Sequence, residues 1–159
     1  MNPRTIHVRS ATLDDASIIA DFNIRMAMET ELLALDPSVI FPGVRALFDD
    51  PSRGQYFVAE VRNQVVGCLM ITHEWSDWRN GDIWWIQSVY VHPDFRRQGV
   101  FSALYRHSAN MARSAKAVGL RLYMEQENST AQATYQKLGM HVTHYQMLQQ
   151  MFSDDQPAT

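Results

Sequence analysis

The stretch from residue 82 to residue 125 constrains the fold more than any other part of the chain. Residues 82–91 (DIWWIQSVYV) are apolar on both alternating faces, a pattern typical of a strand in the middle of a sheet. Apolar and small residues then recur at helical spacing over 100–117, and residues 120–125 (LRLYME) return to a strand pattern. A strand, a helix and a strand in this order predict a right-handed crossover between two parallel strands.

The rest of the chain adds antiparallel strands and helices around this crossover. The further expected elements are a strand at 6–10, a helix at 13–29, a short helix around Val44, Leu47 and Phe48, a hairpin of strands at 55–61 and 65–73, a helix containing Ala131, Tyr135 and Leu138, and one or two closing strands within 141–152. The predicted fold class is α/β (α+β), in the order β-α-α-β-β-β-α-β-α-β(β), with a mixed central sheet of six or seven strands. We expect one domain over 1–152 and a polar tail over 153–159.

Composition and charge disfavour several classes of protein. A chain of 159 residues, 46% of them hydrophobic, is long enough to bury a core. A net charge of −3 disfavours a broad basic surface, so we expect no nucleic-acid partner. We also expect no membrane association, because no apolar run approaches the ~20 residues of a membrane span and the first residues lack the apolar core of a signal peptide. The single cysteine, Cys68, cannot form an internal disulfide, which favours a cytoplasmic location.

Two arginines and a glycine, Arg96, Arg97 and Gly99, stand where the strand at 82–91 gives way to the helix at 100–117. The first turn of a helix has unpaired N–H groups and a partial positive charge, and glycine lets a ligand approach the backbone closely. Arginines add charge-assisted hydrogen bonds, so this junction suits a phosphate group. The plainer interpretation is a helix start with solvated arginines. The motifs G-x-x-x-x-G-K-[ST] and G-x-G-x-x-G are absent.

A second pattern follows the crossover, where Asn128 lies beside a helix start and Tyr135 comes seven residues later. Taken alone, Asn128 is a capping residue and Tyr135 a packing residue. Together, V-x-V-x-P-x-x-R-R-x-G and N-x-x-A-x-x-x-Y-x-x-x-G-M resemble the GCN5-related N-acetyltransferase (GNAT) family. The matching residues are Val89, Val91, Pro93, Arg96, Arg97, Gly99, Asn128, Ala131, Tyr135, Gly139 and Met140. The chain departs from the family at Phe101, where a small Gly or Ala is usual.

The resemblance implies transfer of an acetyl group from acetyl-coenzyme A to a primary amine of a small molecule or peptide, by direct attack on the thioester. It also implies that the strands at 82–91 and 120–125 splay apart and that the coenzyme lies along the first of them. The coenzyme-binding residues it implies are Val89, Tyr90, Val91, Arg96, Arg97, Gln98, Gly99, Val100, Phe101, Ser102, Asn128 and Tyr135. A backbone N–H near Val89 or Tyr90 would stabilise the oxyanion, and the backbone of Val89 and Val91 would pair with the pantetheine arm.

The resemblance makes Tyr135 the general acid that protonates the departing thiolate. For the base that deprotonates the amine we expect Glu125; the alternatives are Glu29, Glu74, His73 and a water relay. We expect Glu29, Trp75 and Trp85 to contact the acceptor, with a cation over the aromatic rings. No metal is expected.

Two other functions fit the same pattern. One is a non-catalytic module that binds acetyl-coenzyme A as a sensor or interaction partner. The other is transfer of a different acyl group, such as succinyl, which needs arginines in the acceptor cleft. The apolar closing segment 141–152 also allows a homodimer.

Overall fold

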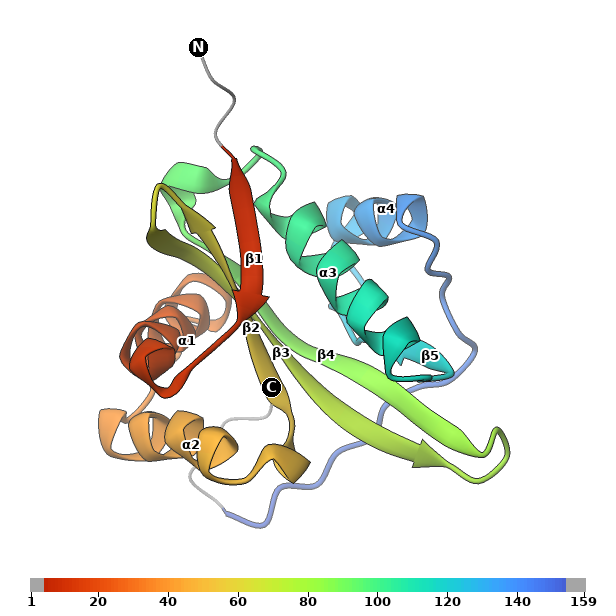
Figure 1. The fold of residues 1–159 in the computed structure, drawn as a ribbon. Helices are drawn as coiled ribbons and strands as arrows, with labels where there is room; N and C mark the ends of the chain where they lie inside the picture. The colour runs from red at the N-terminus through yellow and green to blue at the C-terminus, as the bar shows by residue number, and fades with distance from the viewer. Residues whose placement is uncertain (1–4, 154–159) are drawn as a thin grey trace. The chain divides into compact units, whose positions relative to one another are not determined.

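The structure, a computed structural model, describes residues 5–153. The chain forms two compact units, one ending at Leu122 and the other beginning at Tyr123. The first unit contains a mixed five-stranded sheet in the order β1-β2-β3-β4-β5 (Figure 1). The strands are β1 (Ile6–Ser10), β2 (Gln55–Val61), β3 (Gln64–Ser76), β4 (Gly81–Val91) and β5 (Gly119–Arg121). Of the expected tail at 153–159, all but residue 153 lies outside the described residues.

The pairing of the strands agrees with the crossover expected from the sequence. The first four strands pair antiparallel in chain order, and β4 pairs with β5 in parallel. The helices are α1 (Ala16–Glu31), α2 (Pro37–Asp49), α3 (Val100–Ser114) and, in the second unit, α4 (Ser129–Lys137). Helices α1 and α2 cover one face of the sheet, called here the α1 face, and α3 covers the other, the α3 face (Figure 1).

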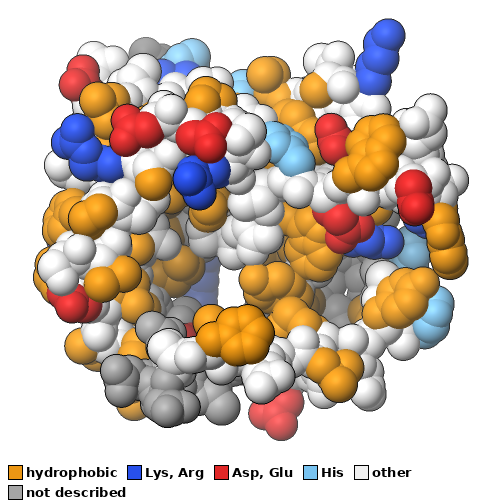
Figure 2. Space-filling model, turned by 90° about the horizontal axis from the view of Figure 1, so that it is seen from below, with side chains coloured by type: hydrophobic (Ala, Val, Ile, Leu, Met, Phe, Trp, Pro, Cys, Tyr) orange, Lys and Arg blue, Asp and Glu red, His pale blue; other side chains and the backbone are white. Residues whose placement is uncertain are grey.

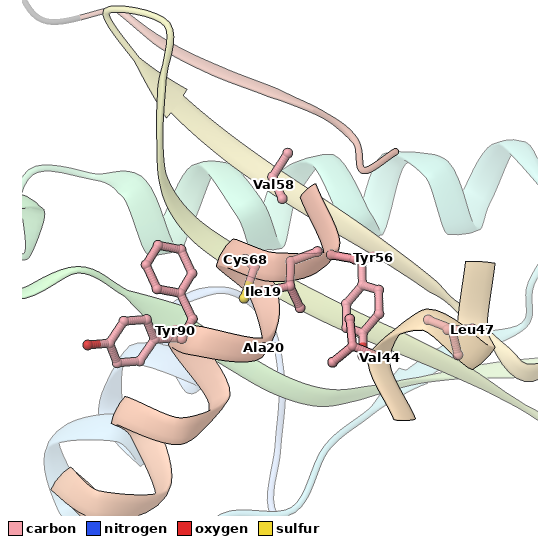
Figure 3. Close-up of a cluster of buried hydrophobic side chains, with 10 residues drawn as sticks. Ile19, Ala20, Val44, Leu47, Tyr56, Val58, Cys68 and Tyr90 are labelled. Carbon is pink, nitrogen blue, oxygen red and sulfur yellow. The ribbon is translucent and has the colours of Figure 1, made fainter. Parts of the chain in front are cut away.

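Alternation of side chains along the strands builds a core on each face. Figure 3 shows the core on the α1 face, where residues of α1 and α2 meet side chains of β2, β3 and β4. Its labelled members are Ile19, Ala20, Val44, Leu47, Tyr56, Val58, Cys68 and Tyr90. On the α3 face, the ring of Phe57 in β2 meets the edge of the His107 ring of α3, with ring centroids 4.8 Å apart.

Local signals explain where the helices begin. The Thr12 N–H donates to Asp15 Oδ2 at 2.7 Å, as in a capping box before α1. Helix α2 begins earlier than expected because Asp36 caps it, its side chain accepting from the Ser38 N–H at 2.9 Å. Pro37 occupies the first turn, where a helix tolerates proline. Pro42 lies inside this helix.

The fold class is confirmed, whereas the strand count is lower than predicted. Residues 141–152 carry no strand, and β5 is shorter than the expected 120–125. Large apolar side chains of the closing segment are exposed, Phe152 to 96%, so no burial offsets the cost of ordering a strand there. Strand β3 is longer than the expected 65–73, because it continues to Ser76, which pairs with Gly81. Among the described residues, no helix has the length and apolar character needed to cross a bilayer.

Candidate functional site

Strand β4 pairs with β5 over only part of the length of β4. The two strands pair only at Ile83 with Gly119, Trp84 with Leu120 and Trp85 with Arg121. β5 ends at this point and offers no partner to the rest of β4. On the other side of β4, the register with β3 shifts between Ile86 and Ser88, so Gln87 is the extra residue of a β-bulge. The bulge therefore lies directly beyond the last pair with β5, where the predicted splay begins.

The backbone of β4 beyond the bulge presents hydrogen-bonding groups toward its free edge. The His92 N–H donates to Val66 O of β3 at 2.8 Å. Because backbone groups in an antiparallel ladder point alternately to the two sides, the groups of Tyr90 face β3 and those of Val89 and Val91 face the free edge. Of the two candidates for an oxyanion donor, the alternation therefore favours the N–H of Val89.

The loop between β4 and α3 turns the chain sharply toward the first helical turn. It contains a 3-10 turn at Pro93–Phe95 and two residues with left-handed backbone, Arg97 (φ 61°) and Gly99 (φ 87°). A Cβ on Gly99 would be 3.8 Å from the nearest atom, so its conformation and not lack of space favours glycine. No side chain caps the first turn of α3 within the described residues. The junction thus offers main-chain donors at a helix start, as an anion site requires.

A glycine in β3 lets this helix start approach the sheet. A Cβ on Gly67 would lie 2.9 Å from Tyr90 O and 3.3 and 3.4 Å from side-chain carbons of Val100 and Leu104. Val100 and Leu104 are fully buried, so they hold the first turns of α3 against β3. Gly67 therefore sets the position of the N–H groups at the helix start.

Arg96 and Arg97 differ in what surrounds their side chains. Arg96 Nη2 pairs with Glu29 Oε2 at 2.7 Å, and its Nε donates to Val91 O at 2.9 Å. Its guanidinium carbon also lies 5.5 Å from the centre of the Tyr90 ring. Arg97 is exposed and has no side-chain partner among residues 5–153. The Arg96 side chain therefore connects the loop to α1 and β4. The exposed Arg97 side chain is the one that a ligand can reach.

Tyr90 connects this loop to α1. Its hydroxyl donates to Glu29 Oε1 at 3.0 Å, and its ring packs against Phe22 with centroids 5.0 Å apart. Figure 3 shows the Tyr90 side chain on the α1 side of the sheet. Burial and this bond raise the pKa of Tyr90, while the hydrogen bond from Arg96 holds the pKa of Glu29 below its ordinary value. The Glu29 carboxylate, expected to contact the acceptor, is therefore bound within the protein.

The other expected acceptor residues separate onto the two faces of the sheet. Trp85 pairs with Thr72 and lies on the α1 face, where its Nε1 donates to Glu74 Oε1 at 3.0 Å. Trp75 pairs with Asp82 on the opposite face and is 63% exposed. The two tryptophans therefore cannot contact the same acceptor group from one face of the sheet.

The remaining expected residues belong to the second unit. Asn128 caps α4, its Oδ1 accepting from the Ala131 N–H at 3.1 Å, and the Asn128 N–H donates to Glu125 O at 3.1 Å. Tyr135 lies on α4 and is half-buried. Glu125, Asn128 and Tyr135 are thus carried by one short stretch of this unit.

Other features of the surface do not coincide with the site. Within the described part of the chain, no group of three or more His, Cys, Asp or Glu side chains could hold a metal ion. A surface hollow of about 140 Å³ lies beside α2 and has apolar walls that include Leu47, Phe48 and Tyr56. No expected site residue lines it. On the face seen in Figure 2, acidic and basic side chains lie close together among hydrophobic ones.

Comparison with known proteins identifies the family. Residues 25–140 match the acetyltransferase (GNAT) family. The chain belongs to the GNAT family. No curated protein matches it.

Solved structures of similar proteins agree with this membership. The crystal structure of a possible acetyltransferase from Clostridium difficile 630 is 44% identical, with a TM-score of 0.87 over 93% of this chain and 98% of that one. Two structures share the fold at low identity. A ribosomal-protein-alanine N-acetyltransferase from Brucella melitensis biovar Abortus 2308 is 16% identical, with a TM-score of 0.74 over 92% of this chain and 100% of that one. An aminoglycoside N-acetyltransferase in complex with CoA is 14% identical, with a TM-score of 0.77 over 94% of this chain and 97% of that one.

Two features of this GNAT protein, and the position of a third, escaped the interpretation of the sequence. Gly67, an isolated glycine in an apolar strand, is a signal of close backbone approach that could have been used. The bulge at Gln87 has no such signal, because it depends on the register with β3. Arg121 lies beside Glu74 and Trp85 only because β5 pairs in parallel with β4, which a sequence does not reveal.

Proposed function

We propose that the protein is an N-acetyltransferase that moves the acetyl group of acetyl-coenzyme A to a primary amine of a small molecule or peptide. The observation that supports this most is the free edge of β4, which runs from the bulge at Gln87 to Val91 and is joined by a loop to the helix start at Val100. An extended ligand can pair with the backbone of this edge as an added strand, and the helix start beside it suits an anion. Together they suit a ligand with an amide-containing arm and a diphosphate. Membership of the GNAT family supports the same ligand.

The residues of the first unit suit acetyl-coenzyme A in three ways. In the proposal, main-chain N–H groups from Arg97 to Ser102 bind the diphosphate, and the exposed Arg97 side chain adds a charge-assisted hydrogen bond. Arg96 keeps the loop in place through Glu29 and Val91 O. The C=O of Val89 and the N–H of Val91 pair with the pantetheine arm. Gln98, Gly99, Val100, Phe101 and Ser102 line the same turn.

The bond-making step needs one donor to the thioester oxygen and two proton transfers. In the proposal, the Val89 N–H stabilises the negative charge that develops on the carbonyl oxygen, an interaction worth about 2.7–4 kcal/mol in other acyl transfers. Tyr135 donates a proton to the departing sulfur, Asn128 holds the coenzyme or an ordered water, and Glu125 accepts a proton from the amine. Trp85 contacts the acceptor. Trp75, on the opposite face of the sheet, is not assigned a role.

Two measurements on the same protein test the proposal. Acetyl-coenzyme A should raise the melting temperature, because a ligand that binds only the folded state stabilises it. A panel of amines, peptides included, should then release free thiol from acetyl-coenzyme A with at least one member. An unchanged melting temperature together with no thiol release would contradict the proposal.

The assignment of Tyr135 is tested separately. Tyr135→Phe should lower turnover by roughly tenfold or more, with a smaller effect on coenzyme affinity, because it removes the proton and keeps the ring. Equal losses of turnover and affinity would indicate a binding role only.

The second candidate function is a non-catalytic module that binds the coenzyme. It is favoured because the carboxylate of Glu29, one of the alternative bases, is bound by Arg96 and Tyr90. Coenzyme binding without thiol release across the whole amine panel would favour this function over the enzyme.

A further inference from the structure

Three side chains form a charged cluster at the point where β4 and β5 part. Glu74 of β3 accepts from Trp85 Nε1 at 3.0 Å through its Oε1. Its Oε2 pairs with Arg121 Nη1 of β5 at 2.7 Å. The carboxylate therefore bridges β4 and β5, the two strands whose separation opens the free edge.

Near Trp85, the last residue of β4 that pairs with β5, the polar side chains lie on the α1 face. Trp84 and Ile86 point to the α3 face and are buried there. On the α1 face, Gln87 Nε2 donates to Thr72 Oγ1 at 2.7 Å, next to the charged cluster. An arm that follows the free edge of β4 from Val91 reaches the bulge at Gln87 after about four residues, or roughly 13 Å of strand. A reactive group there meets polar side chains of the α1 face.

Arg121 retains the capacity to bind a second anion. Its Nη1 is bound to Glu74, while its Nε and Nη2 have no partner among residues 5–153. The Arg121 side chain is 32% exposed and that of Glu74 is 39% exposed, so water and small ligands reach the pair. The bond to Glu74 restricts the guanidinium to this face, which lowers the entropy lost when a ligand binds.

We propose that Arg121, oriented by Glu74, binds a carboxylate of the acceptor, so that the enzyme prefers amines that also carry a carboxylate, as free amino acids do. The proposal rests on the proposed function, because it names the acceptor class for the same site. A guanidinium presents a planar fork of N–H donors that matches a carboxylate, and such charge-assisted bonds are about twice as strong as neutral ones. The same amines should be poorer acceptors when their carboxylate is neutralised.

The experiment compares matched acceptors. Free amino acids and the corresponding amino-acid amides are offered with acetyl-coenzyme A, and thiol release gives kcat/KM for each pair. The carboxylate form should be used at least tenfold better than the amide for the best acceptors, with most of the difference in KM. Equal use of the two forms would overturn the carboxylate preference and leave acetyl transfer standing. No thiol release with any acceptor would overturn both.

Variants of Arg121 test whether this residue causes the preference for amines that carry a carboxylate. Arg121→Gln should reduce the ratio of kcat/KM values for carboxylate and amide at least tenfold, mainly by raising KM for the carboxylate, and Arg121→Lys should fall between. Arg113→Gln, an exposed arginine near the end of α3, is the matched control and should keep the ratio. A ratio that is unchanged in a folded Arg121→Gln protein, as judged by its melting temperature, would overturn the proposal.

The carboxylate recognised by Arg121 has one other source, the acyl group itself. Succinyl-coenzyme A and acetyl-coenzyme A are therefore compared with an amino-acid amide as acceptor. The proposal expects no preference for succinyl. A preference for succinyl that is lost in Arg121→Gln would assign the carboxylate to the acyl donor and overturn its assignment to the acceptor.

Discussion

Arg96 and Glu29 form an ion pair of 2.7 Å that joins the loop before α3 to the last turn of α1. A carboxylate near a helix C-terminus is unfavourable next to the helix dipole, and the arginine offsets that cost. Glu29 also accepts from the Tyr90 hydroxyl, so the same carboxylate fixes the β4 side chain between Val89 and Val91. The position of the turn before α3 therefore depends on α1 as well as on β4.

The two neighbouring arginines should respond differently to truncation. Arg97→Ala should weaken coenzyme binding roughly tenfold or more, the value of a hydrogen bond to a charged group, with little change in melting temperature. Arg96→Ala should lower the melting temperature as well, because it removes the bonds to Glu29 and Val91 O. Titration calorimetry with coenzyme A and thermal melting measure the two effects. A loss of affinity in Arg96→Ala alone, with Arg97→Ala unaffected, would contradict this division.

Gly67 should be intolerant of even one methyl group. In Gly67→Ala the new Cβ would lie 2.9 Å from Tyr90 O and 3.3 Å from a Val100 side-chain carbon, so the backbone of β3 must shift away from Tyr90 O and the Val100 side chain must adjust. We expect a loss of about 1–3 kcal/mol in the free energy of unfolding and a weaker affinity for coenzyme A. Urea unfolding and calorimetry measure these changes.

The control for this substitution is Gly43→Ala in α2. A Cβ at Gly43 meets nothing within 4 Å, and alanine favours a helix over glycine. This variant should be unchanged or more stable by up to about 1 kcal/mol. A Gly67→Ala protein as stable as Gly43→Ala, with full affinity for the coenzyme, would show that the close packing is not required.

The sequence predicts the parts of this fold that depend on local periodicity. The two-sided apolar pattern of β4 and the helical pattern of α3 identify the crossover, and the hairpin predicted at 55–61 and 65–73 forms as β2 and β3. The closing strands at 141–152 are wrong because apolar alternation does not reveal whether a sheet edge is available as a partner. The homodimer expected from that segment stays a prediction, as does the cytoplasmic location.

The contacts of the candidate site are less predictable, because they join distant parts of the chain. Arg96 and Glu29 are 67 residues apart, and Glu74 and Arg121 are 47 apart. Only the register of β3, β4 and β5 brings Glu74 and Arg121 together. The residue types predict a phosphate site, whereas the different surroundings of the Arg96 and Arg97 side chains are visible only in the structure.

Cys68 should be inert in the folded protein. Burial raises the pKa of its thiol to about 12, so almost no thiolate is present at pH 8. A chromogenic disulfide reagent should label one thiol per chain in denaturant and react with the native protein only at the rate of unfolding. Cys68→Ala should abolish the signal in denaturant. Rapid labelling of the native protein would contradict the burial and would also add background to assays of thiol release.

Stability at acid pH should depend on Asp15, which lies between β1 and α1. Arg9 donates to both Asp15 oxygens, at 2.7 and 3.0 Å, and the Asp15 side chain is only 9% exposed. The hydrogen bond from Arg9 is the main cause that lowers the pKa of Asp15 below its ordinary 3.8, against the opposing effect of burial. The folded state therefore favours the ionised form, and this stabilisation is fully present above pH 3.8 and is lost as pH falls through the lowered pKa.

Asp15→Asn should accordingly lower the free energy of unfolding by about 1–3 kcal/mol at pH 7, since it removes the charge that pairs with Arg9 but keeps an oxygen for the Thr12 N–H. The difference from the unmodified protein should shrink as pH falls below 3.8, because protonation then removes the same charge from Asp15. Urea unfolding between pH 7 and pH 2.5 measures it. Asp14→Asn, on an exposed neighbour, is the control and should change stability by no more than about 0.5 kcal/mol. A difference between Asp15→Asn and the unmodified protein that stays constant across this pH range would mean that the Arg9 pair does not set the acid stability.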